Sequence, residues 1–202
     1  MLIFVVLLIA VLAAFLSYYY IIPRKDTTDT ADIPDSYIIE SDNRIDIQKK
    51  FECAAFSSAY LLRHFDIEAD GDELYHKYPH KLFGGNVAPK GVVAFFRKRG
   101  FDATFHNGSI PSLKKHISQG IPVIVFTRVF PGKRYLHFVP VIGYDEKHLY
   151  FAESLKYLVN CNEKYYNRKM LISEFEAVWR TWVPFCNNTY ILIRHSSCYS
   201  TH

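Results

Sequence analysis

Apolar positions are continuous only at the start of the chain. Residues 1–22, MLIFVVLLIAVLAAFLSYYYII, contain no charged side chain and are long enough to cross a bilayer of about 30 Å as a helix. No Lys or Arg precedes the apolar run, and no small-x-small cleavage site follows it before Tyr18, which favours an uncleaved anchor over a signal peptide. We therefore predict a transmembrane anchor over residues 1–22.

Polar positions dominate the next segment, residues 23–43, where Asp, Thr, Ser and Pro predict a stalk. Arg24 and Lys25 favour the cytoplasmic side of a membrane, whereas a lone N-terminal anchor commonly leads its following domain outward. We expect a single-pass protein of the cell membrane with its domain on the extracellular side. Residues 44–195 then form one globular domain, and residues 196–202 form a tail.

Within the domain, apolar residues recur at helical spacing in three places. Small residues come early in the first of these segments, which predicts close packing of its first turns against a neighbour. The second begins with proline, and the second and third are each followed by glycine or end at it, as helices commonly do. The predicted helices cover residues 53–65, 89–100 and 109–119.

The second half of the domain reads mainly as strands. Residues 135–154, YLHFVPVIGYDEKHLYFAES, predict a hairpin in which Tyr144 pairs with His148. Pro140 counts against a regular central strand, because proline cannot donate to the ladder.

A late helix and a final strand complete the pattern. Ser173 and Glu176 form a capping box, and apolar spacing extends the helix to Trp182. The strand TYILIRH follows. Helices followed by mostly antiparallel strands indicate an α+β fold.

Composition and charge narrow the function classes. The net charge of +4 is mild, Lys and Arg are dispersed, and no nucleic-acid module is recognisable, so no nucleic-acid partner is expected. His76 and His80 have helical metal-ligand spacing, but Pro79 interrupts that helix. No CxxC pair occurs, so we expect neither a metal nor a cofactor. On an oxidising side of the membrane, one disulfide could form among three cysteines: Cys161, Cys186 and Cys198.

Cys53 lies at the start of the first predicted domain helix, where a polar segment changes to small apolar residues. The positive end of the helix dipole and the unpaired N–H groups there favour a thiolate. A small buried hydrophobe is the alternative role, so the position alone does not assign a nucleophile.

A partner histidine strengthens the case for catalysis. His137 opens the strand HFVPVIGYD, and the predicted hairpin makes Glu153 its diagonal neighbour on the same face. A thiolate nucleophile requires an imidazole, and the imidazole requires an orienting acceptor. Gln48, five residues before Cys53, could bring a side-chain amide to the same point as an oxyanion donor.

In this order the residues resemble the papain-like cysteine peptidases of the bacteriocin-processing type, which cut peptide precursors after a double-glycine leader. The resemblance extends from Gln48 to Trp179. It implies a papain-like fold in which the helix carrying the cysteine packs on a mostly antiparallel sheet. It also implies that Cys53 is the nucleophile, His137 the general base and acid, Glu153 the orienting carboxylate and Gln48 the oxyanion donor.

The chain departs from the family pattern in four ways: two dipeptides differ, Gln48 is one residue nearer the cysteine than is typical, and Pro140 is unusual. It has Cys53-Ala54 where the family usually has Cys-Gly, and Glu153-Ser154 where the family usually has Asp-Pro. The resulting hypothesis is a membrane-anchored cysteine peptidase that acts on a peptide or protein through a Cys-His-Glu triad and a thioester. The alternatives are an amidase or acyltransferase of the same fold and a catalytically silent peptide-binding module.

Overall fold

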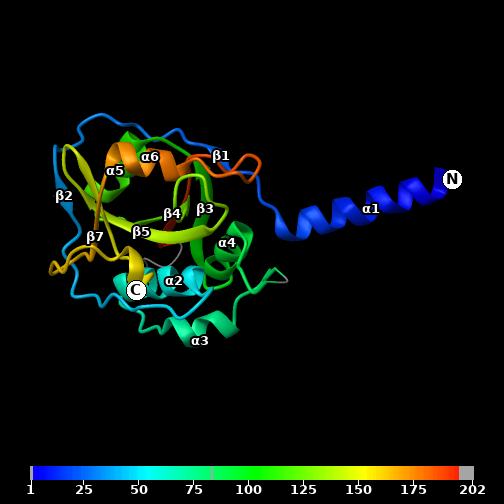
Figure 1. Ribbon diagram of the computed structural model, residues 1–202, viewed down its shortest axis with the longest axis horizontal. Helices are drawn as coiled ribbons and strands as arrows, with labels where there is room; N and C mark the ends of the chain where they lie inside the picture. The colour runs from blue at the N-terminus through cyan, green and yellow to red at the C-terminus, as the bar shows by residue number, and fades with distance from the viewer. Residues whose placement is uncertain (1, 83, 196–202) are drawn as a thin grey trace, which may run out of the picture.

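A mixed sheet of eight strands organises the computed structural model, which describes residues 2–82 and 84–195 (Figure 1). The strand order is β1-β3-β8-β4-β5-β6-β7, and β2 pairs with β5. β1 runs parallel to β3, and the other pairings within the described sheet are antiparallel. The strands are β1 Arg24–Lys25, β2 Tyr37–Ile38, β3 Phe101–Asn107, β4 Val123–Arg128, β5 Leu136–Tyr144, β6 His148–Phe151, β7 Arg168–Leu171 and β8 Thr189–His195.

Helices cover both faces of this sheet and create two apolar cores. α2 and α4 pack on one face, with α3 against the outer side of α2, and α5 and α6 pack on the other face (Figure 1). β8 serves both cores because alternate side chains of a strand point to opposite faces: Ile191 and Ile193 enter the first core, Tyr190 and Leu192 the second. The helices are α1 Leu2–Tyr19, α2 Cys53–His64, α3 Gly71–His76, α4 Pro89–Arg97, α5 Ile110–Ser118, the 3-10 turn η1 Lys156–Leu158 and α6 Ile172–Trp179.

The predicted α+β class and three of the predicted helices are confirmed. α2, α4 and α5 fall within the expected ranges 53–65, 89–100 and 109–119. Pro89 is the first residue of α4, and the hydroxyl of Ser109 caps α5 by accepting the N–H of Ser112 at 3.3 Å. These starts are set by residues at the helix ends themselves, which is why the sequence predicts them well.

The predicted capping box at Ser173 is wrong. α6 begins one residue earlier, at Ile172, and its N-cap residue Leu171 makes no side-chain cap. β7 leads directly into α6, and the N–H of Ile172 donates to the carbonyl of Lys147 at 2.8 Å. A contact from a distant turn therefore sets the start of this helix. The helix also ends at Trp179, short of Trp182.

The hairpin of β5 and β6 has the predicted register at one end only. Tyr144 pairs with Leu149, where the sequence predicted His148. A β-bulge follows Val141, so that Val141 pairs with Phe151 in the predicted register. The prediction is wrong at the turn and right at the end of the hairpin that carries the candidate site.

Pro140 lies inside β5, opposite Ile124, although proline argued against a regular central strand. Its carbonyl accepts the N–H of Ala152 at 3.1 Å. In an antiparallel ladder, the nitrogen and the carbonyl of one residue point to the same neighbouring strand. The Pro140 nitrogen, which has no hydrogen to donate, therefore points to the chain just beyond the end of β6. The proline thus removes no bond from the paired part of β6.

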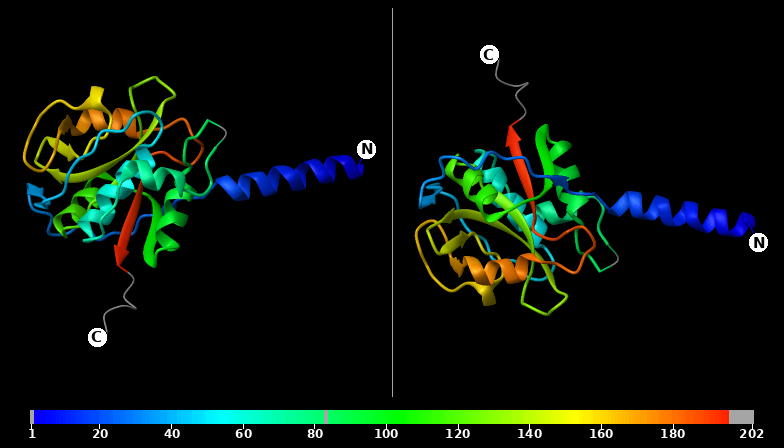
Figure 2. Two further views of the ribbon diagram at one scale, coloured as in Figure 1. Left: turned by 90° about the horizontal axis from the view of Figure 1, so that it is seen from below. Right: turned by 90° about the horizontal axis from the view of Figure 1, so that it is seen from above.

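α1 spans 18 residues, about 27 Å at 1.5 Å per residue. It projects from the domain (Figure 2). In the part of the chain that the structure describes, no helix is both long and apolar enough to cross a membrane. The predicted transmembrane anchor over residues 1–22 is therefore not supported. Tyr20 and Ile21, which that prediction placed in the span, pack instead against the core that contains α2 and α4.

The segment predicted as a polar stalk, residues 23–43, lies along the domain. β1 pairs with β3, β2 pairs with β5, and Ile39 is buried beside α5. Backbone pairing to β3 and β5 holds this segment despite its polar composition. The predicted tail, residues 196–202, lies outside the described residues.

Candidate active site

Cys53 is the first residue of α2, and its side chain is half-buried. The N-cap residue Glu52 makes no side-chain bond to the helix. The first N–H groups of a helix have no partner within the helix and form the positive end of its dipole. The thiol therefore lies where the sequence predicted it, at a helix end that favours a negative sulfur.

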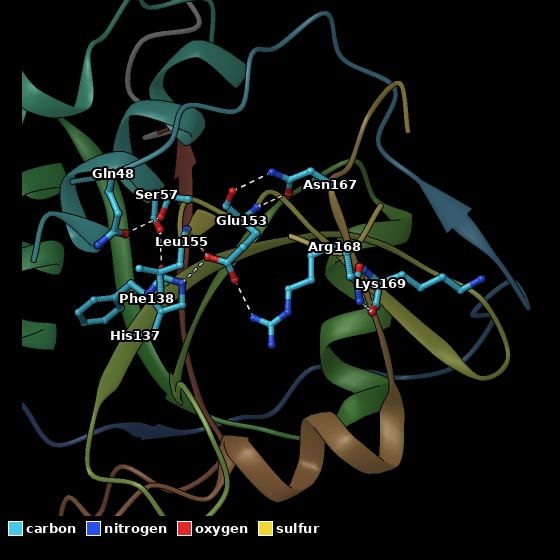
Figure 3. A network of polar contacts seen from close by, with 11 residues as sticks. Gln48, Ser57, His137, Phe138, Glu153, Leu155, Asn167, Arg168 and Lys169 are labelled. Carbon is cyan, nitrogen blue, oxygen red and sulfur yellow. Dashed lines mark hydrogen bonds and ion pairs between the residues drawn. The ribbon is translucent and has the colours of Figure 1, made fainter. Parts of the chain in front are cut away.

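His137 approaches Cys53 from the beginning of β5. It pairs with Thr127 of β4, is only 1% exposed, and its imidazole donates a hydrogen bond to the Cys53 sulfur. Ser57, one helical turn after Cys53, donates its hydroxyl to the carbonyl of Phe138 at 2.9 Å. This bond ties α2 to the strand residue next to His137, so the helix and the strand are locked together at the site (Figure 3).

Glu153 follows β6 and is fully buried, with 0% exposure. Its Oε1 atom lies 2.8 Å from Nε2 of His137, which leaves Nδ1 of the ring for the Cys53 sulfur. The same oxygen accepts the N–H of Leu155 at 2.8 Å. The other oxygen, Oε2, lies 2.6 Å from Nη1 of Arg168. The structure thus brings the predicted cysteine, histidine and acid together. Figure 3 shows Glu153 between His137 and Arg168.

These contacts favour the charged forms of the histidine and the acid. Burial by itself lowers the pKa of His137, but the charges and hydrogen bonds of Glu153 and Cys53 outweigh burial and raise the pKa to about 9. Burial raises the pKa of Glu153, but His137, Arg168 and the Leu155 N–H outweigh it and lower the pKa to about 2. An imidazolium beside a carboxylate is therefore the stable state at neutral pH.

Gln48 is joined to the same group of residues through Ser154. Its backbone N–H donates to the Ser154 carbonyl at 2.9 Å, and its Oε1 accepts the Ser154 hydroxyl at 2.7 Å. Its Nε2 donates to the carbonyl of Lys50 at 2.8 Å. An amide nitrogen carries two hydrogens, so this nitrogen can give one more hydrogen bond. The serine that replaces the usual proline fixes which end of the amide can donate.

Three residues that hold these groups were not predicted from the sequence: Ser57, Asn167 and Arg168. Asn167 makes two bonds to the backbone of Glu153: its Oδ1 accepts the Glu153 N–H at 2.7 Å, and its Nδ2 donates to the Glu153 carbonyl at 2.8 Å. No local pattern marks these residues, because each acts on an element far away along the chain. The one available signal is Arg168 itself, a charged residue that opens a strand.

The other candidate sites do not assemble. His76 ends α3, and His80 has a positive φ of 54° and makes an edge-to-face contact with Tyr18. Within residues 2–82 and 84–195, no group of three or more His, Cys, Asp or Glu is arranged to hold a metal ion. Cys161 and Cys186 are free thiols, and Cys198 lies outside the described residues.

A scan against protein-family models matches residues 42–184 to the peptidase C39-like family. This range includes all four residues singled out from the sequence: Gln48, Cys53, His137 and Glu153. No curated protein sequence matches the chain.

Solved structures with the same fold are similar at low identity. A protein from Bacillus anthracis described as a C39-like peptidase has a TM-score of 0.61 and 18% identity, covering 81% of this chain and 100% of its own. The peptidase domain of Streptococcus ComA, a bi-functional ABC transporter of a quorum-sensing pathway, has a TM-score of 0.58 and 16% identity, covering 77% and 100%. A double-glycine motif protease from an AMS/PCAT transporter, solved with a leader peptide, has a TM-score of 0.55 and 14% identity, covering 79% and 95%.

Proposed function

The chain belongs to the peptidase C39-like family, and we propose that it is a cysteine peptidase that hydrolyses peptide bonds through Cys53, His137 and Glu153. The observation that carries this proposal is the continuous hydrogen-bonded chain from the Cys53 sulfur through the buried imidazole to the buried carboxylate. A nucleophile, a base and an orienting acid in direct contact form the arrangement that nucleophilic acyl transfer requires.

Acylation follows from this geometry. The Cys53 thiolate attacks the carbonyl carbon of the scissile bond, and the carbonyl electrons move to oxygen. The backbone N–H of Cys53, which has no partner within the helix, and the remaining N–H of Gln48 are the proposed donors to this oxyanion. His137 then gives its proton to the leaving amine, the C–N bond breaks, and a thioester remains.

Deacylation uses the same groups in reverse. Neutral His137 takes a proton from water, and the hydroxide attacks the thioester carbon. The C–S bond breaks, and the product acid and the Cys53 thiolate are released beside the imidazolium. Glu153 holds the ring in both steps without taking a proton, since its pKa is lowered to about 2.

A peptide substrate is the proposed ligand. The support is that the double-glycine motif protease with a similar fold was solved with a leader peptide. Precursor peptides with a Gly-Gly pair before the cleavage point are therefore the first substrates to test.

Two measurements test the function. The first is the rate of Cys53 alkylation by iodoacetamide between pH 5 and 10, read by peptide mass spectrometry so that the other cysteines do not interfere. We expect rapid reaction well below pH 8 in the wild-type chain and an ordinary thiol in His137→Ala. Equal rates in the two proteins would contradict the Cys-His pair and favour a silent binding module.

The second measurement is product analysis after incubation with the Gly-Gly peptides, with Cys53→Ala as the inactive control. Cleavage by the wild-type chain alone supports the peptidase. A reactive Cys53 that cleaves none of the peptides would favour an amidase or acyltransferase of the same fold.

Location at the cell membrane, with the domain on the extracellular side, stays a prediction. Its support is the exposed apolar surface of α1, where Ile3 is 78% exposed and Ile9 is 60% exposed. Flotation with phospholipid vesicles tests attachment, using a variant in which Val5, Ile9 and Leu12 are replaced by lysine as the control. Equal flotation of both chains would contradict attachment through α1.

A further inference from the structure

Arg168 contacts the oxygen of Glu153 that His137 does not use. Its Nη1 atom lies 2.6 Å from Oε2 of Glu153, and the arginine is only 7% exposed. Arg168 opens β7 and pairs across the ladder with Phe151, and its guanidinium lies 5.6 Å from the Phe151 ring. The cation is therefore held by the strand that leads into Glu153.

A glutamate at this position needs more support than an aspartate, because its longer side chain has one additional rotatable bond. A single hydrogen bond to the imidazole would leave the carboxylate free to rotate. Here Leu155 holds Oε1 and Arg168 holds Oε2, while Asn167 fixes the Glu153 backbone through two hydrogen bonds. Two consecutive residues, 167 and 168, thus fix both the backbone and the side chain of Glu153.

The charges of the site also balance through this contact. A thiolate, an imidazolium, a carboxylate and a guanidinium sum to zero. Without Arg168, the buried group would carry one uncompensated negative charge, which is costly away from water and opposes thiolate formation.

From these observations we propose that Arg168 is a positioning residue for the active site: it holds Glu153 in the orientation that fixes the His137 imidazole against Cys53. This inference rests on the proposed peptidase function and adds to it a residue that the Cys-His-Glu triad does not include.

The test compares Arg168→Met with Lys169→Met. Lys169 is the next residue of β7, its side chain is 40% exposed, and its ion-pair partner is Asp145 at 3.8 Å. The readout is Cys53 alkylation by iodoacetamide against pH, on the full chain and without any substrate. We expect the rate of Arg168→Met at pH 7 to fall about tenfold or more, as for loss of a buried charge-assisted bond. We expect Lys169→Met to stay within about twofold of wild type.

Two features separate positioning from a general loss of structure. The pH of half-maximal rate should move upward in Arg168→Met, because the added net negative charge opposes the thiolate. Arg168→Lys should recover most of the rate, because the contact is a single N–H to oxygen bond that an ammonium can also make. Thermal unfolding of each variant checks the fold. If Arg168→Met does not fold, the lysine variant and the double variant below carry the test.

The decisive measurement is the effect of Arg168→Met in a protein that already carries Glu153→Gln. If Arg168 acts through the carboxylate, adding Arg168→Met to Glu153→Gln should change the rate by no more than about twofold. A full additional loss in the double variant, or equal rates in Arg168→Met and Lys169→Met, would overturn the proposal. Wild-type Cys53 that reacts as an ordinary thiol would instead remove the proposed function, and the role of Arg168 with it.

Discussion

Replacing Glu153 with glutamine should separate the imidazolium from the anion that stabilises it. The pKa of His137 is raised from 6.5 to about 9, and this difference of about 2.5 units corresponds to about 3 kcal/mol in favour of the protonated ring. Burial lowers this pKa, the Glu153 charge is the largest influence that raises it, and Cys53 raises it further. The ring without the Glu153 charge should therefore have a pKa well below 9.

The raised pKa of His137 determines in which pH range the substitution should change the protonation of the ring. Because the pKa is raised, the His137 ring stays protonated below about pH 9 and loses its proton as the pH rises through that value. At pH 8 the wild-type ring should be about 90% protonated, and the Glu153→Gln ring should be protonated to a much smaller extent. The variant should therefore lose thiolate–imidazolium pairs first on the alkaline side.

The assay is NMR titration of the His137 ring between pH 5 and 10, together with Cys53 alkylation over the same range. Glu146→Gln, an exposed substitution in the β5–β6 turn, is the matched control and should leave both curves unchanged. A Glu153→Gln protein whose His137 still titrates near pH 9 would refute this electrostatic account. Thermal unfolding belongs in the same experiment, since the variant leaves the buried Arg168 cation without its carboxylate.

Two further substitutions test how the site is held. Ser57→Ala removes the bond between α2 and the Phe138 carbonyl; we expect about 1 kcal/mol less stability in urea unfolding and slower Cys53 alkylation, and unchanged reactivity would contradict a role in aligning the helix with the strand. Ser154→Ala removes the hydrogen bond that holds the Gln48 amide. Peptide cleavage should fall about tenfold, which is less than the loss of about 10²–10³ when an oxyanion donor is removed altogether. Cys53 alkylation forms no oxyanion and should not change. An equal loss in both assays would contradict the oxyanion role.

Local signals explain most of what could be predicted. The start of α4 at Pro89 and the start of α5 after its N-cap Ser109 are specified by residues at the helix ends. The Cys53 helix is indicated by the spacing of apolar residues along it. The pairing of His137 with Glu153 is also a short-range consequence, because a hairpin with a short turn fixes which residues meet. The β-bulge after Val141 left that pairing intact and shifted only the turn.

Predictions failed where a distant contact sets the local structure. The start of α6 depends on the Lys147 carbonyl, and not on the capping box at Ser173. The polar composition of residues 23–43 gave no indication that backbone hydrogen bonds join this segment to the sheet. Backbone pairing to strands of a sheet requires no apolar side chains, so the pattern of apolar residues does not indicate it.

The sequence by itself determined the α+β class, the position of Cys53 at a helix start and the strand that presents His137 beside Glu153, because these depend on interactions between residues that are near in the chain. Only the tertiary structure decided how the acid is held. Arg168, the first residue of β7, and Asn167 just before it reach Glu153, and Ser154 reaches Gln48 across a separation of 106 residues. A buried carboxylate needs partners whatever their place in the chain, and folding alone determines which residues can reach it.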